Sequence, residues 1–467
     1  MSITERTNAA RSVLLQNCHV IATMAPSAAG GRLEIAGGYV LIRGNLVERV
    51  GSAEEAPPPA DEIIDMTDHV VMPGMVNTHH HMFQSLTRAV PAAQDCELFD
   101  WLRAHYPLWC RLTPDMIRVS ALTAMAELIL SGCTTASDHL YLYPNGSRID
   151  DEIDAATLIG IRFHPGRGGM SMGESQGGLP PDRLTEREDV ILREMQRAIE
   201  VFHDDSRCSM LRIGVAPCSP FTVTPDLMRE SAKLARAHRV HLHTHLAENW
   251  KDVAFSRERY GLDPVDYAED LGWLGGDVWH AHCVHLGDRG IGMFARTGTG
   301  VAHCPTSNMR LASGIAPVAK MRAAGVRVGL GVDGSASNDG GHFLLEARQA
   351  MLLQRVAHCD SLGPAAMPAR AALEMATVGG AAVLGRDDIG QIVPGFAADI
   401  VAFDLNDIGY AGQHDPVAAL ALCAPARVAW SMIDGKVVVA GGRLTTIDAG
   451  ELAGRQRGMA VRLLRDE

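Results

Sequence analysis

The sequence lacks the features that direct a chain into or across a membrane. Its 467 residues contain no stretch of about 18 or more uncharged apolar residues, so no membrane-spanning helix is expected. Residues 1–12 are polar and have no apolar core of the kind found in signal peptides. The ten cysteines show no paired spacing, which indicates reduced thiols rather than a disulfide framework. These absences predict a cytoplasmic protein with no membrane partner.

Basic residues are too few and too scattered for a nucleic-acid-binding surface. Lys and Arg number 42 against 55 Asp and Glu, which gives a net charge of −13. Because phosphate binding needs a basic patch, and no basic run is present, nucleic acid is not expected as a partner. The remaining composition, 47% hydrophobic and 21% charged, is typical of a globular protein. At this length we expect two domains, or one large barrel with an accessory domain.

The two ends of the chain resemble each other and differ from the middle. Short runs predicted as strands occur near both ends: residues 13–24, 38–51, 399–405 and 428–444. Gly44–Asn45 and Asp434–Gly435 each lie between two apolar runs, which is the signature of a hairpin. The economical interpretation is one β-sandwich domain built from residues 1–72 and 394–467. Two separate small β-caps are the alternative.

Between residues 73 and 393, short apolar strands alternate with helices. Strands are expected at residues 161–163, 212–216, 240–246, 278–282, 300–302 and 326–332. Two helices begin with the same Thr-Pro-Asp signature, in which Thr113 or Thr224 caps the helix and proline takes its first position. Repeated alternation of this kind predicts an α/β fold with a (β/α)8 TIM-like barrel. Active sites in such barrels lie at the carboxyl ends of the strands.

Histidines occupy alternate positions at the end of the first expected strand. In PGMVNTHHH, His79 and His81 point to one side and His80 points to the other. Two imidazoles on one face can hold a metal ion. Alone, the pattern fits a histidine-rich loop equally well.

A second histidine cluster, HLHTHLAE, ends another strand. His241, His243 and His245 share one face, so periodicity does not choose among them. Position favours His245, which is nearest the carboxyl end of the strand. Glu248 follows just outside the strand, where it suits a general base that later becomes a general acid. The alternative for Glu248 is an exposed carboxylate that begins a helix.

Two more motifs follow strands. In WHAHCVH, His280 and His282 share a face and His285 lies in the loop beyond, and each of them taken alone is more typical of a core or surface histidine. In GLGVDGS, Asp333 directly follows an apolar strand and precedes glycine. It suits a metal ligand or a base, although turn residues and helix caps show the same pattern.

Together the four motifs fall in order at the ends of strands one, five, six and eight. Three histidines and an aspartate form a nitrogen and oxygen ligand set that suits zinc or ferrous iron. Zinc lowers the pKa of a bound water to about 7, which supplies a nucleophile at neutral pH. The combined pattern therefore favours a metal site over coincidence.

These motifs resemble those of the amidohydrolase superfamily, in its cytosine deaminase-like and triazine hydrolase-like branch. The matching text is PGMVNTHHH, HTHLAE, AHCVHL, AHCPTSNMRL, GLGVDGSASND and GQIVPGFAADIVAFDL, and the resemblance covers essentially the whole chain. It implies one divalent ion, zinc before iron, with the ligands His79, His81, His245 and Asp333. It further implies that Glu248 shuttles protons, that His282 polarises the attacked carbon of the substrate or steadies the hydroxide, and that Asp333 also accepts a proton. Relatives are commonly homo-oligomers.

Lysine is nearly absent, and this bears on the number of metal ions. Two-metal members of the superfamily carry a carbamylated lysine on the fourth strand. That strand, residues 211–216, contains none. The chain has four lysines, none at a strand end: Lys233, Lys251, Lys320 and Lys436. A single-metal site is therefore expected.

The resemblance also bears on the substrate. Adenosine-type deaminases of this branch usually have Gly-Pro-His-Ser-Pro after strand four, whereas residues 216–220 read APCSP, which disfavours S-adenosylhomocysteine and methylthioadenosine. The segments HHHMFQSLTRAVPAAQD, LFDWLRAHYPLW and SDHLYLYPN are similar to those of bacterial 8-oxoguanine deaminases. That similarity implies hydrolysis of 8-oxoguanine to urate and ammonia. Alternatives are isoxanthopterin, hydroxytriazine, guanine or cytosine rings and, from another class, a non-catalytic metal-binding protein.

Three further residues are candidates for contact with such a heterocycle. Gln84 can both donate and accept hydrogen bonds at a lactam edge, or it caps a helix. Arg167 offers a fork of donors to a carbonyl oxygen, or it pairs with a surface acid. Cys218 packs against the 8-oxo edge, or it is a small buried hydrophobe. Trp101 and Trp109 either cover the flat ring or belong to the core.

Overall fold

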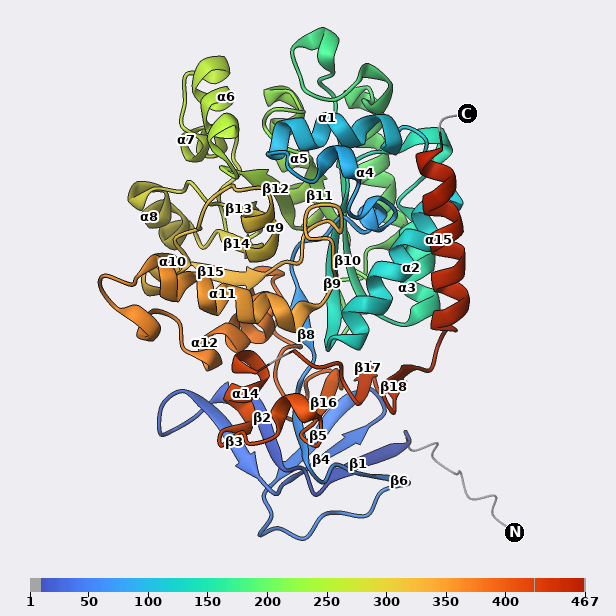
Figure 1. Ribbon diagram of the computed structural model, residues 1–467, viewed down its shortest axis with the longest axis vertical. Coiled ribbons are helices and arrows are strands. Elements are labelled where there is room, and N and C mark those ends of the chain that lie inside the picture. The colour runs from blue at the N-terminus through green and yellow to red at the C-terminus, as the bar shows by residue number, and fades with distance from the viewer. Residues whose placement is uncertain (1–9, 424, 466–467) are drawn as a thin grey trace.

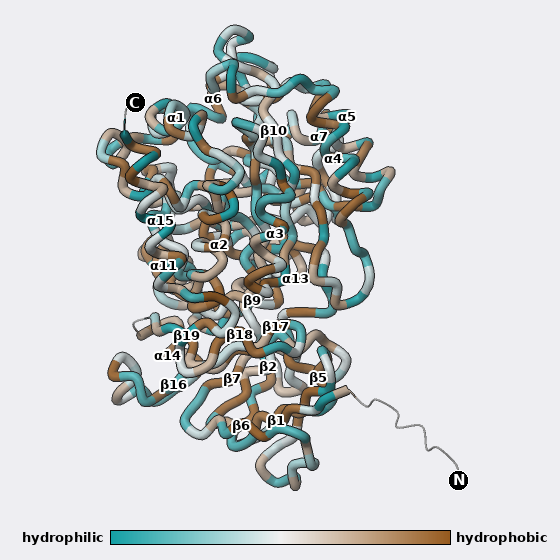
Figure 2. The backbone as a smooth tube through the Cα atoms, turned by 90° about the vertical axis from the view of Figure 1, so that its right-hand side faces the viewer, coloured by the Kyte–Doolittle hydropathy of each residue, from teal (hydrophilic) through white to brown (hydrophobic). Residues whose placement is uncertain are grey.

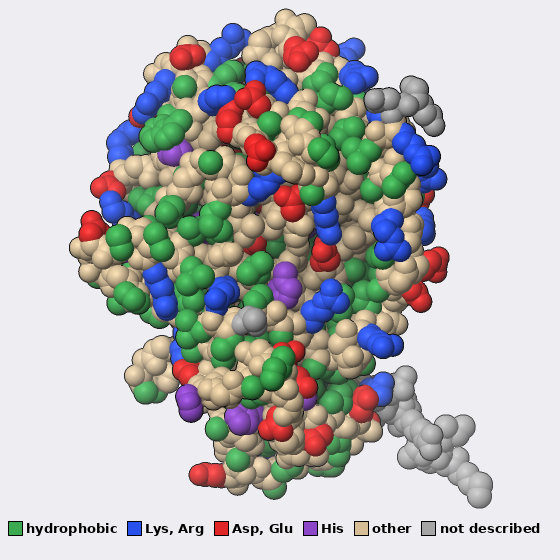
Figure 3. Space-filling view, in the orientation of Figure 1, with side chains coloured by type: hydrophobic (Ala, Val, Ile, Leu, Met, Phe, Trp, Pro, Cys, Tyr) green, Lys and Arg blue, Asp and Glu red, His purple; other side chains and the backbone are tan. Residues whose placement is uncertain are grey.

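The chain folds into a helix-covered barrel with a β-rich domain at one end (Figure 1). The computed structural model describes residues 10–423 and 425–465. Within these ranges, no helix combines the length and apolar character needed to cross a membrane. On the face seen in Figure 3, positively and negatively charged side chains are interspersed.

Eight parallel strands close into the barrel in the order β10-β11-β12-β13-β14-β15-β8-β9. Their bounds are β8 (Met75–Asn77), β9 (Cys133–Leu140), β10 (Arg162–Gly169), β11 (Gly214–Pro217), β12 (Leu242–Leu246), β13 (Val278–His282), β14 (Gly300–His303) and β15 (Arg327–Leu330). The predicted TIM-like barrel is thereby confirmed. The six apolar runs expected as strands correspond to β10 through β15.

The second barrel strand, β9, is one that apolar runs did not predict. Its sequence, CTTASDHL, is mostly polar, yet all eight residues are buried. Two of these polar side chains have hydrogen-bond partners, which lowers the cost of burying them. Asp138 Oδ1 accepts the backbone N–H of Met82 at 2.8 Å, and His139 Nε2 lies 2.7 Å from the carbonyl oxygen of Ala216. Hydrophobicity alone therefore misses this strand.

The outer helices include the two that the Thr-Pro-Asp signature predicted. Thr113 Oγ1 accepts the N–H of Met116 at 3.3 Å, and Thr224 Oγ1 accepts that of Leu227 at 3.1 Å. The helices are α1 (Leu98–Trp109), α2 (Pro114–Leu130), α3 (Asp150–Ile159), α4 (Glu188–Phe202), α5 (Pro225–His238), α6 (Trp250–Tyr260), α7 (Pro264–Asp270), α8 (Asp288–Thr297), α9 (Pro305–Arg310), α10 (Val318–Ala323), α11 (Phe343–Ala357), α12 (Ala369–Glu374), α13 (Gly380–Val383), α14 (Pro416–Leu422) and α15 (Ala449–Leu464).

Both ends of the chain build the β-rich domain. One sheet has the order β5-β4-β1-β6, and the other has the order β19-β18-β17-β16-β7-β2-β3. The strands are β1 (Ser12–Gln16), β2 (Val20–Pro26), β3 (Arg32–Ala36), β4 (Tyr39–Arg43), β5 (Leu46–Gly51), β6 (Glu62–Asp65), β7 (His69–Pro73), β16 (Ile400–Asp404), β17 (Trp430–Ile433), β18 (Lys436–Ala440) and β19 (Arg443–Leu444). Strands β7 and β16 pair antiparallel, so one domain forms rather than two caps. Figure 2 shows brown, hydrophobic stretches of this domain near β1 and β7, among more polar segments.

Both predicted hairpins are present in this domain, as β4–β5 and β17–β18. Only Gly74 separates the last residue of β7 from the first residue of β8, so the sheet domain leads directly into the barrel. The proposed domain boundaries, 1–72 with 394–467 and 73–393, stay a prediction.

The C-terminal helix α15 returns to the side of the barrel, where it lies beside α2 (Figure 1). Gln456 Nε2 donates to Ser85 Oγ at 3.0 Å. Ser85 belongs to η1 (Met82–Thr87), a 3-10 helix that directly follows the HHH segment. The end of the chain thus supports the segment that carries the first histidine pair.

Candidate metal centre and active site

The sequence motifs meet at the carboxyl end of the barrel, around a cavity that is partly open to solvent. One side of this cavity is polar and is formed by side chains from the strand ends, among them His81, His245, Glu248, His282 and Asp333. The other side is largely apolar and is formed by α1 through Leu98, Trp101, Leu102 and Tyr106. The cavity therefore combines a polar floor with an aromatic cover.

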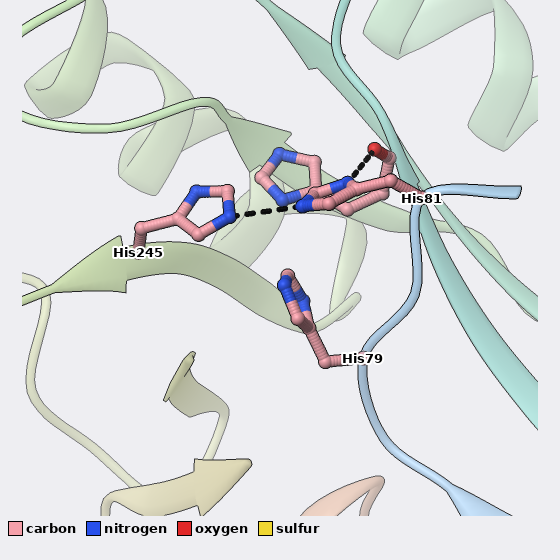
Figure 4. Close-up of side chains that lie close together, drawn as sticks. His79, His81 and His245 are labelled. Carbon is pink, nitrogen blue, oxygen red and sulfur yellow. Dashed lines mark hydrogen bonds between the residues drawn. The ribbon is translucent and has the colours of Figure 1, made fainter. Parts of the chain in front are cut away.

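His79, His81 and His245 converge with Asp333, as Figure 4 shows for the three histidines. His81 Nε2 lies 3.1 Å from His245 Nε2. Asp333 Oδ1 lies 3.3 Å from His79 Nε2 and 3.4 Å from His81 Nε2. All four side chains are buried. Ligands of a tetrahedral zinc at about 2.0–2.1 Å are about 3.3 Å apart, so the spacing fits such an ion.

The hydrogen-bond partners of two of these rings fix which nitrogen carries the hydrogen. His81 Nδ1 lies 2.7 Å from the carbonyl oxygen of His139, and His245 Nδ1 lies 2.6 Å from that of Cys218. Because a carbonyl oxygen only accepts, both Nδ1 atoms donate, and each neutral ring keeps a lone pair on Nε2. Two lone pairs 3.1 Å apart cannot bond to each other. A cation between them resolves this contact.

Burial keeps these rings uncharged. It lowers the pKa of His245 to about 3, and it also lowers the pKa of His81 and, more strongly, that of His79. Burial by itself would raise the pKa of Asp333, but the adjacent imidazoles lower that pKa well below its ordinary value. Among the described residues, His79 Nε2 has no hydrogen-bond partner. Neutral imidazoles and one carboxylate form the donor set that a divalent ion requires.

Glu248 and His282 form the next layer of the site. Glu248 Oε2 lies 3.5 Å from His282 Nε2, which in turn lies 3.8 Å from Asp333 Oδ2. Burial raises the pKa of Glu248 to about 7. His282 Nδ1 lies 2.9 Å from Asn308 Oδ1, which orients the ring. These groups can hold and transfer a proton beside the metal ligands.

His282 and Asp333 adopt a left-handed backbone conformation that residues other than glycine rarely adopt. The φ angle is 69° at His282 and 62° at Asp333. Such conformations concentrate at functional sites. Asp333 is also held by its neighbours, because Gly334 N–H donates to Oδ1 at 2.7 Å and Ser337 Oγ donates to Oδ2 at 3.1 Å.

Two of the three proposed substrate contacts line the cavity. Gln84 Nε2 lies 3.4 Å from Tyr141 Oη, while its Oε1 has no partner among the described residues. A Cβ at position 334 would lie 1.8 Å from Gln84 Oε1, so this approach requires glycine there. Cys218 also lines the cavity, and burial raises the pKa of its thiol to about 12, so it is a neutral thiol.

Arg167, the third proposed substrate contact, is not among the residues that line the cavity. Its two terminal nitrogens each lie 2.9 Å from an oxygen of Glu186, and its guanidinium lies 3.9 Å from the ring centre of Tyr143. The fork of donors is therefore already satisfied by an acid and an aromatic ring. The alternative stated for this residue, a pair with an acid, describes what the structure contains.

The two tryptophans of α1 have different surroundings. Trp101 lines the cavity, and its Nε1 donates to the carbonyl oxygen of Ala336 at 3.0 Å. Trp109 is fully buried, and its Nε1 donates to Thr87 Oγ1 at 3.2 Å. Only Trp101 can contact a ligand.

Three residues of the site were missed by the sequence reasoning. His139 lies near the end of β9, Tyr141 directly follows that strand, and Tyr106 comes from α1. One ring nitrogen of His139 lies close enough to join His79, His81 and His245 in a cluster of possible ligand atoms, all within 4.8 Å of one another. The alternation of His139 and Tyr141 in SDHLYL was a signal for them, but it required β9 to be recognised first.

Comparisons with known proteins agree with this geometry. Residues 70–438 match the model of the amidohydrolase family. The chain is 44% identical to 8-oxoguanine deaminase of Pseudomonas aeruginosa, over 92% of this chain and 96% of that protein. It is 36% identical to isoxanthopterin deaminase of an unknown prokaryotic organism, over 97% and 98% of the two chains. The crystal structure of atrazine chlorohydrolase from Arthrobacter aurescens complexed with zinc aligns with a TM-score of 0.90 and 31% identity, over 96% of this chain and 100% of that one.

Proposed function

The chain belongs to the amidohydrolase family, and we propose that it is a single-metal aminohydrolase that converts 8-oxoguanine and water into urate and ammonia. It is a hydrolase that acts on carbon–nitrogen bonds of cyclic amidines. The observation that carries the proposal is the convergence of His79, His81, His245 and Asp333 beside the Glu248–His282 pair.

We propose zinc as the ion, with iron as the second choice. The ligands would be His79, His81, His245 and Asp333, and the ion would supply an activated water with a pKa near 7. A single ion is supported by the positions of the lysines. All four are exposed and lie in α5, α6, α10 and β18, so none can bridge two ions inside the barrel.

The chain's own groups supply the proton transfers. Glu248 accepts a proton from the attacking water and delivers it to the leaving amino group, so that the amine departs as ammonia. Its raised pKa suits both steps, since the carboxylate can take the proton and then release it. His282 polarises the carbon being attacked, and Asp333 assists in proton removal.

The lining of the cavity suits a flat heterocycle. Trp101 and Tyr106 from α1 offer aromatic surface. Among the described residues no lysine or arginine lines the cavity, so the lining offers no cationic partner for a phosphate group. Gln84 Oε1 and its amide nitrogen would meet the lactam edge, and Cys218 would pack against another edge of the ring. Isoxanthopterin, which also carries an amino-lactam edge, is the second candidate substrate.

A substrate panel tests this proposal. Protein loaded with zinc or with iron is assayed for ammonia release from 8-oxoguanine, isoxanthopterin, a hydroxytriazine, guanine and cytosine. We expect the highest kcat/KM for 8-oxoguanine, with urate as the second product. A higher kcat/KM for another ring would replace the substrate, and no turnover of any ring would favour the non-catalytic alternative.

The homo-oligomeric state and the cytoplasmic location stay proposals, and sedimentation analysis tests the first.

A further inference from the structure

His243 lies directly behind one of the proposed metal ligands. It belongs to β12, two residues before His245, and is fully buried. Its Nε2 lies 2.8 Å from Nδ1 of His79. The sequence pattern had left His243 as one of three candidates for the ligand of this strand. In the structure it faces the back of His79.

The partner on the other side of His243 gives this contact a direction. His243 Nδ1 lies 3.0 Å from the carbonyl oxygen of Trp279, which can only accept a hydrogen bond. The hydrogen of a neutral His243 is therefore on Nδ1, and its Nε2 carries a lone pair. His79 must then donate from Nδ1, which leaves its own lone pair on Nε2, the atom that lies 3.3 Å from Asp333 Oδ1.

Trp279 also restrains the geometry of this chain of contacts. Its indole stacks on the His243 ring with centroids 4.5 Å apart and an angle of 16° between the planes. Its Nε1 donates to the carbonyl oxygen of Thr78 at 3.1 Å, next to His79 in sequence. The same tryptophan thus holds both ends of the His243–His79 contact.

His79 differs in this respect from the other two histidines of the set. The Nδ1 atoms of His81 and His245 donate to main-chain carbonyl oxygens, which no substitution removes. The Nδ1 atom of His79 depends on a side chain. We propose that His243 is a positioning residue that fixes the tautomer and orientation of His79 and so sets the affinity of the site for its metal ion. This inference rests on the proposed metal site, but not on the identity of the substrate.

Metal affinity measured without substrate tests the inference. His243→Leu removes the atom that accepts the hydrogen bond from His79 Nδ1. His243→Gln keeps an acceptor, because its Oε1 can accept from His79 while its Nε2 donates to the carbonyl oxygen of Trp279. The matched control is His164→Leu, since His164 is equally buried but neither of its ring nitrogens has a partner among the described residues. Zinc affinity is measured by competition with a chromophoric chelator, and cobalt-loaded protein reports ligand geometry through its visible absorption bands.

We expect His243→Leu to lower zinc affinity about 10- to 100-fold and to shift the cobalt bands. We expect His243→Gln to stay within about threefold of wild type in affinity, and His164→Leu to leave both readouts unchanged. Wild-type affinity in His243→Leu would overturn the inference, as would an equal loss in His243→Gln. Should His243→Leu not fold, His243→Asn replaces it, because its amide is too short to reach both partners, and it is expected to bind zinc more weakly than His243→Gln.

Two failures can be told apart in this design. A wild-type protein that binds zinc but does not deaminate 8-oxoguanine contradicts the proposed substrate, and the affinity series still decides the role of His243. A wild-type protein that does not bind zinc or cobalt overturns both the metal site and this inference.

Discussion

Glu248 Oε2 lies 3.5 Å from His282 Nε2, and both side chains are buried at the edge of the cavity. Burial favours the neutral form of each, and it raises the pKa of Glu248 to about 7. In His282, burial is outweighed by the nearby Glu248 and Asp333 carboxylates, which raise its pKa above the ordinary value. A proton can therefore pass between the two side chains near neutral pH. Glu248 requires this if it is to act first as a base and then as an acid.

Replacing Glu248 is expected to remove the proton transfer without removing the metal site. Glu248→Gln keeps the shape of the side chain but cannot accept a proton, so we expect kcat to fall by about 10²- to 10⁴-fold with zinc content unchanged. The measurements are steady-state kinetics on 8-oxoguanine and metal analysis of the same sample. Glu258→Gln, on the exposed face of α6, makes the same chemical change as a control. Activity within tenfold of wild type in Glu248→Gln would contradict the assignment.

The raised pKa of Glu248 predicts how kcat/KM falls at low pH, on the acid limb of the pH profile. Below its pKa of about 7, Glu248 is protonated and cannot accept a proton from water. We therefore expect kcat/KM to fall tenfold per pH unit as the pH drops below about 7, at constant zinc content. Zinc must be assayed at each pH, because protonation of the histidine ligands also releases metal at low pH. A flat profile between pH 5.5 and 8, with zinc retained, would show that another group sets the limb.

The sequence predicted the barrel and the metal residues for a physical reason. Parallel strands present their carboxyl ends on one side, so motifs that follow strands one, five, six and eight meet whatever their separation in the chain. Alternation along a strand then selected His79 and His81 over His80. Local pattern and the symmetry of the fold supplied the candidates, and the resemblance to a known family implied the ligand set.

Other parts of the site depend on three-dimensional partners that no local pattern specifies. The pairing of Arg167 with Glu186, nineteen residues away, could not be read from the local pattern, and its role as a substrate contact stays a prediction. Among the histidines of β12, alternation placed His243 and His245 on one face. Position near the carboxyl end of the strand favoured His245, but only the tertiary contacts show that His243 lies behind His79.

The cover formed by α1 is attached to the rim by an exposed ion pair. Glu97, just before α1, pairs with Lys251 Nζ, and Asn249 Nδ2 lies 3.4 Å from Glu97 Oε2. Asn249 follows Glu248 directly, so this contact links the cover to the proton-transfer group.

Loss of this pair is expected to loosen the cover. In Lys251→Met we expect KM to rise by no more than about fivefold, since exposed pairs contribute little, with kcat nearly unchanged. The exchange Glu97→Lys with Lys251→Glu should restore KM, and Lys233→Met, which breaks the exposed Lys233–Glu230 pair, is the control. If the effects of Glu97→Lys and Lys251→Glu on KM simply add in the double variant, the two side chains do not interact, which would contradict this link between the cover and the rim.

Two neighbouring buried acids, Asp138 and Glu152, predict how the stability of the folded protein depends on pH. Asp138 of β9 and Glu152 of α3 are both fully buried. Burial raises the pKa of Asp138 to about 7, and burial together with the neighbouring Asp138 charge raises the pKa of Glu152 well above its ordinary value. The folded protein therefore retains a proton that the unfolded chain releases above about pH 4.5, so the contribution of the pair is greatest at low pH and is lost as pH rises.

Glu152→Gln removes the acid whose ionisation destabilises the folded protein at high pH, and its amide can still donate a hydrogen bond to Asp138. The difference in Tm between the variant and wild type should therefore grow in favour of the variant between pH 5.5 and pH 8.5. Thermal unfolding of zinc-loaded samples in matched buffers measures this difference. A difference that is independent of pH, or that shrinks as pH rises, would mean that the pKa of Glu152 is not raised in the folded protein.

The sheet domain is joined to the barrel by a buried ion pair. Arg162, the first residue of β10, donates from Nε to Asp399 Oδ2 at 2.8 Å and from a terminal nitrogen to Oδ1 at 2.9 Å. Its other terminal nitrogen donates to the carbonyl oxygens of Cys208 and Ser209, and Asp399 Oδ1 also accepts the N–H of Asp434. Both side chains are almost completely buried, with exposures of 1% and 2%.

Asp399→Asn should destabilise the protein by about 3–5 kcal/mol, because it leaves a buried guanidinium without a countercharge. The double variant Arg162→Met with Asp399→Asn should recover part of that loss, since no charge is then left unpaired. Glu48→Gln, at the half-exposed Arg43–Glu48 pair of the same domain, should change the denaturation midpoint little. Because the buried pair begins β10 at the end opposite the cavity, folded Asp399→Asn should retain zinc and kcat. An equal loss of stability in Glu48→Gln, or none in Asp399→Asn, would show that burial does not set the contribution of this pair.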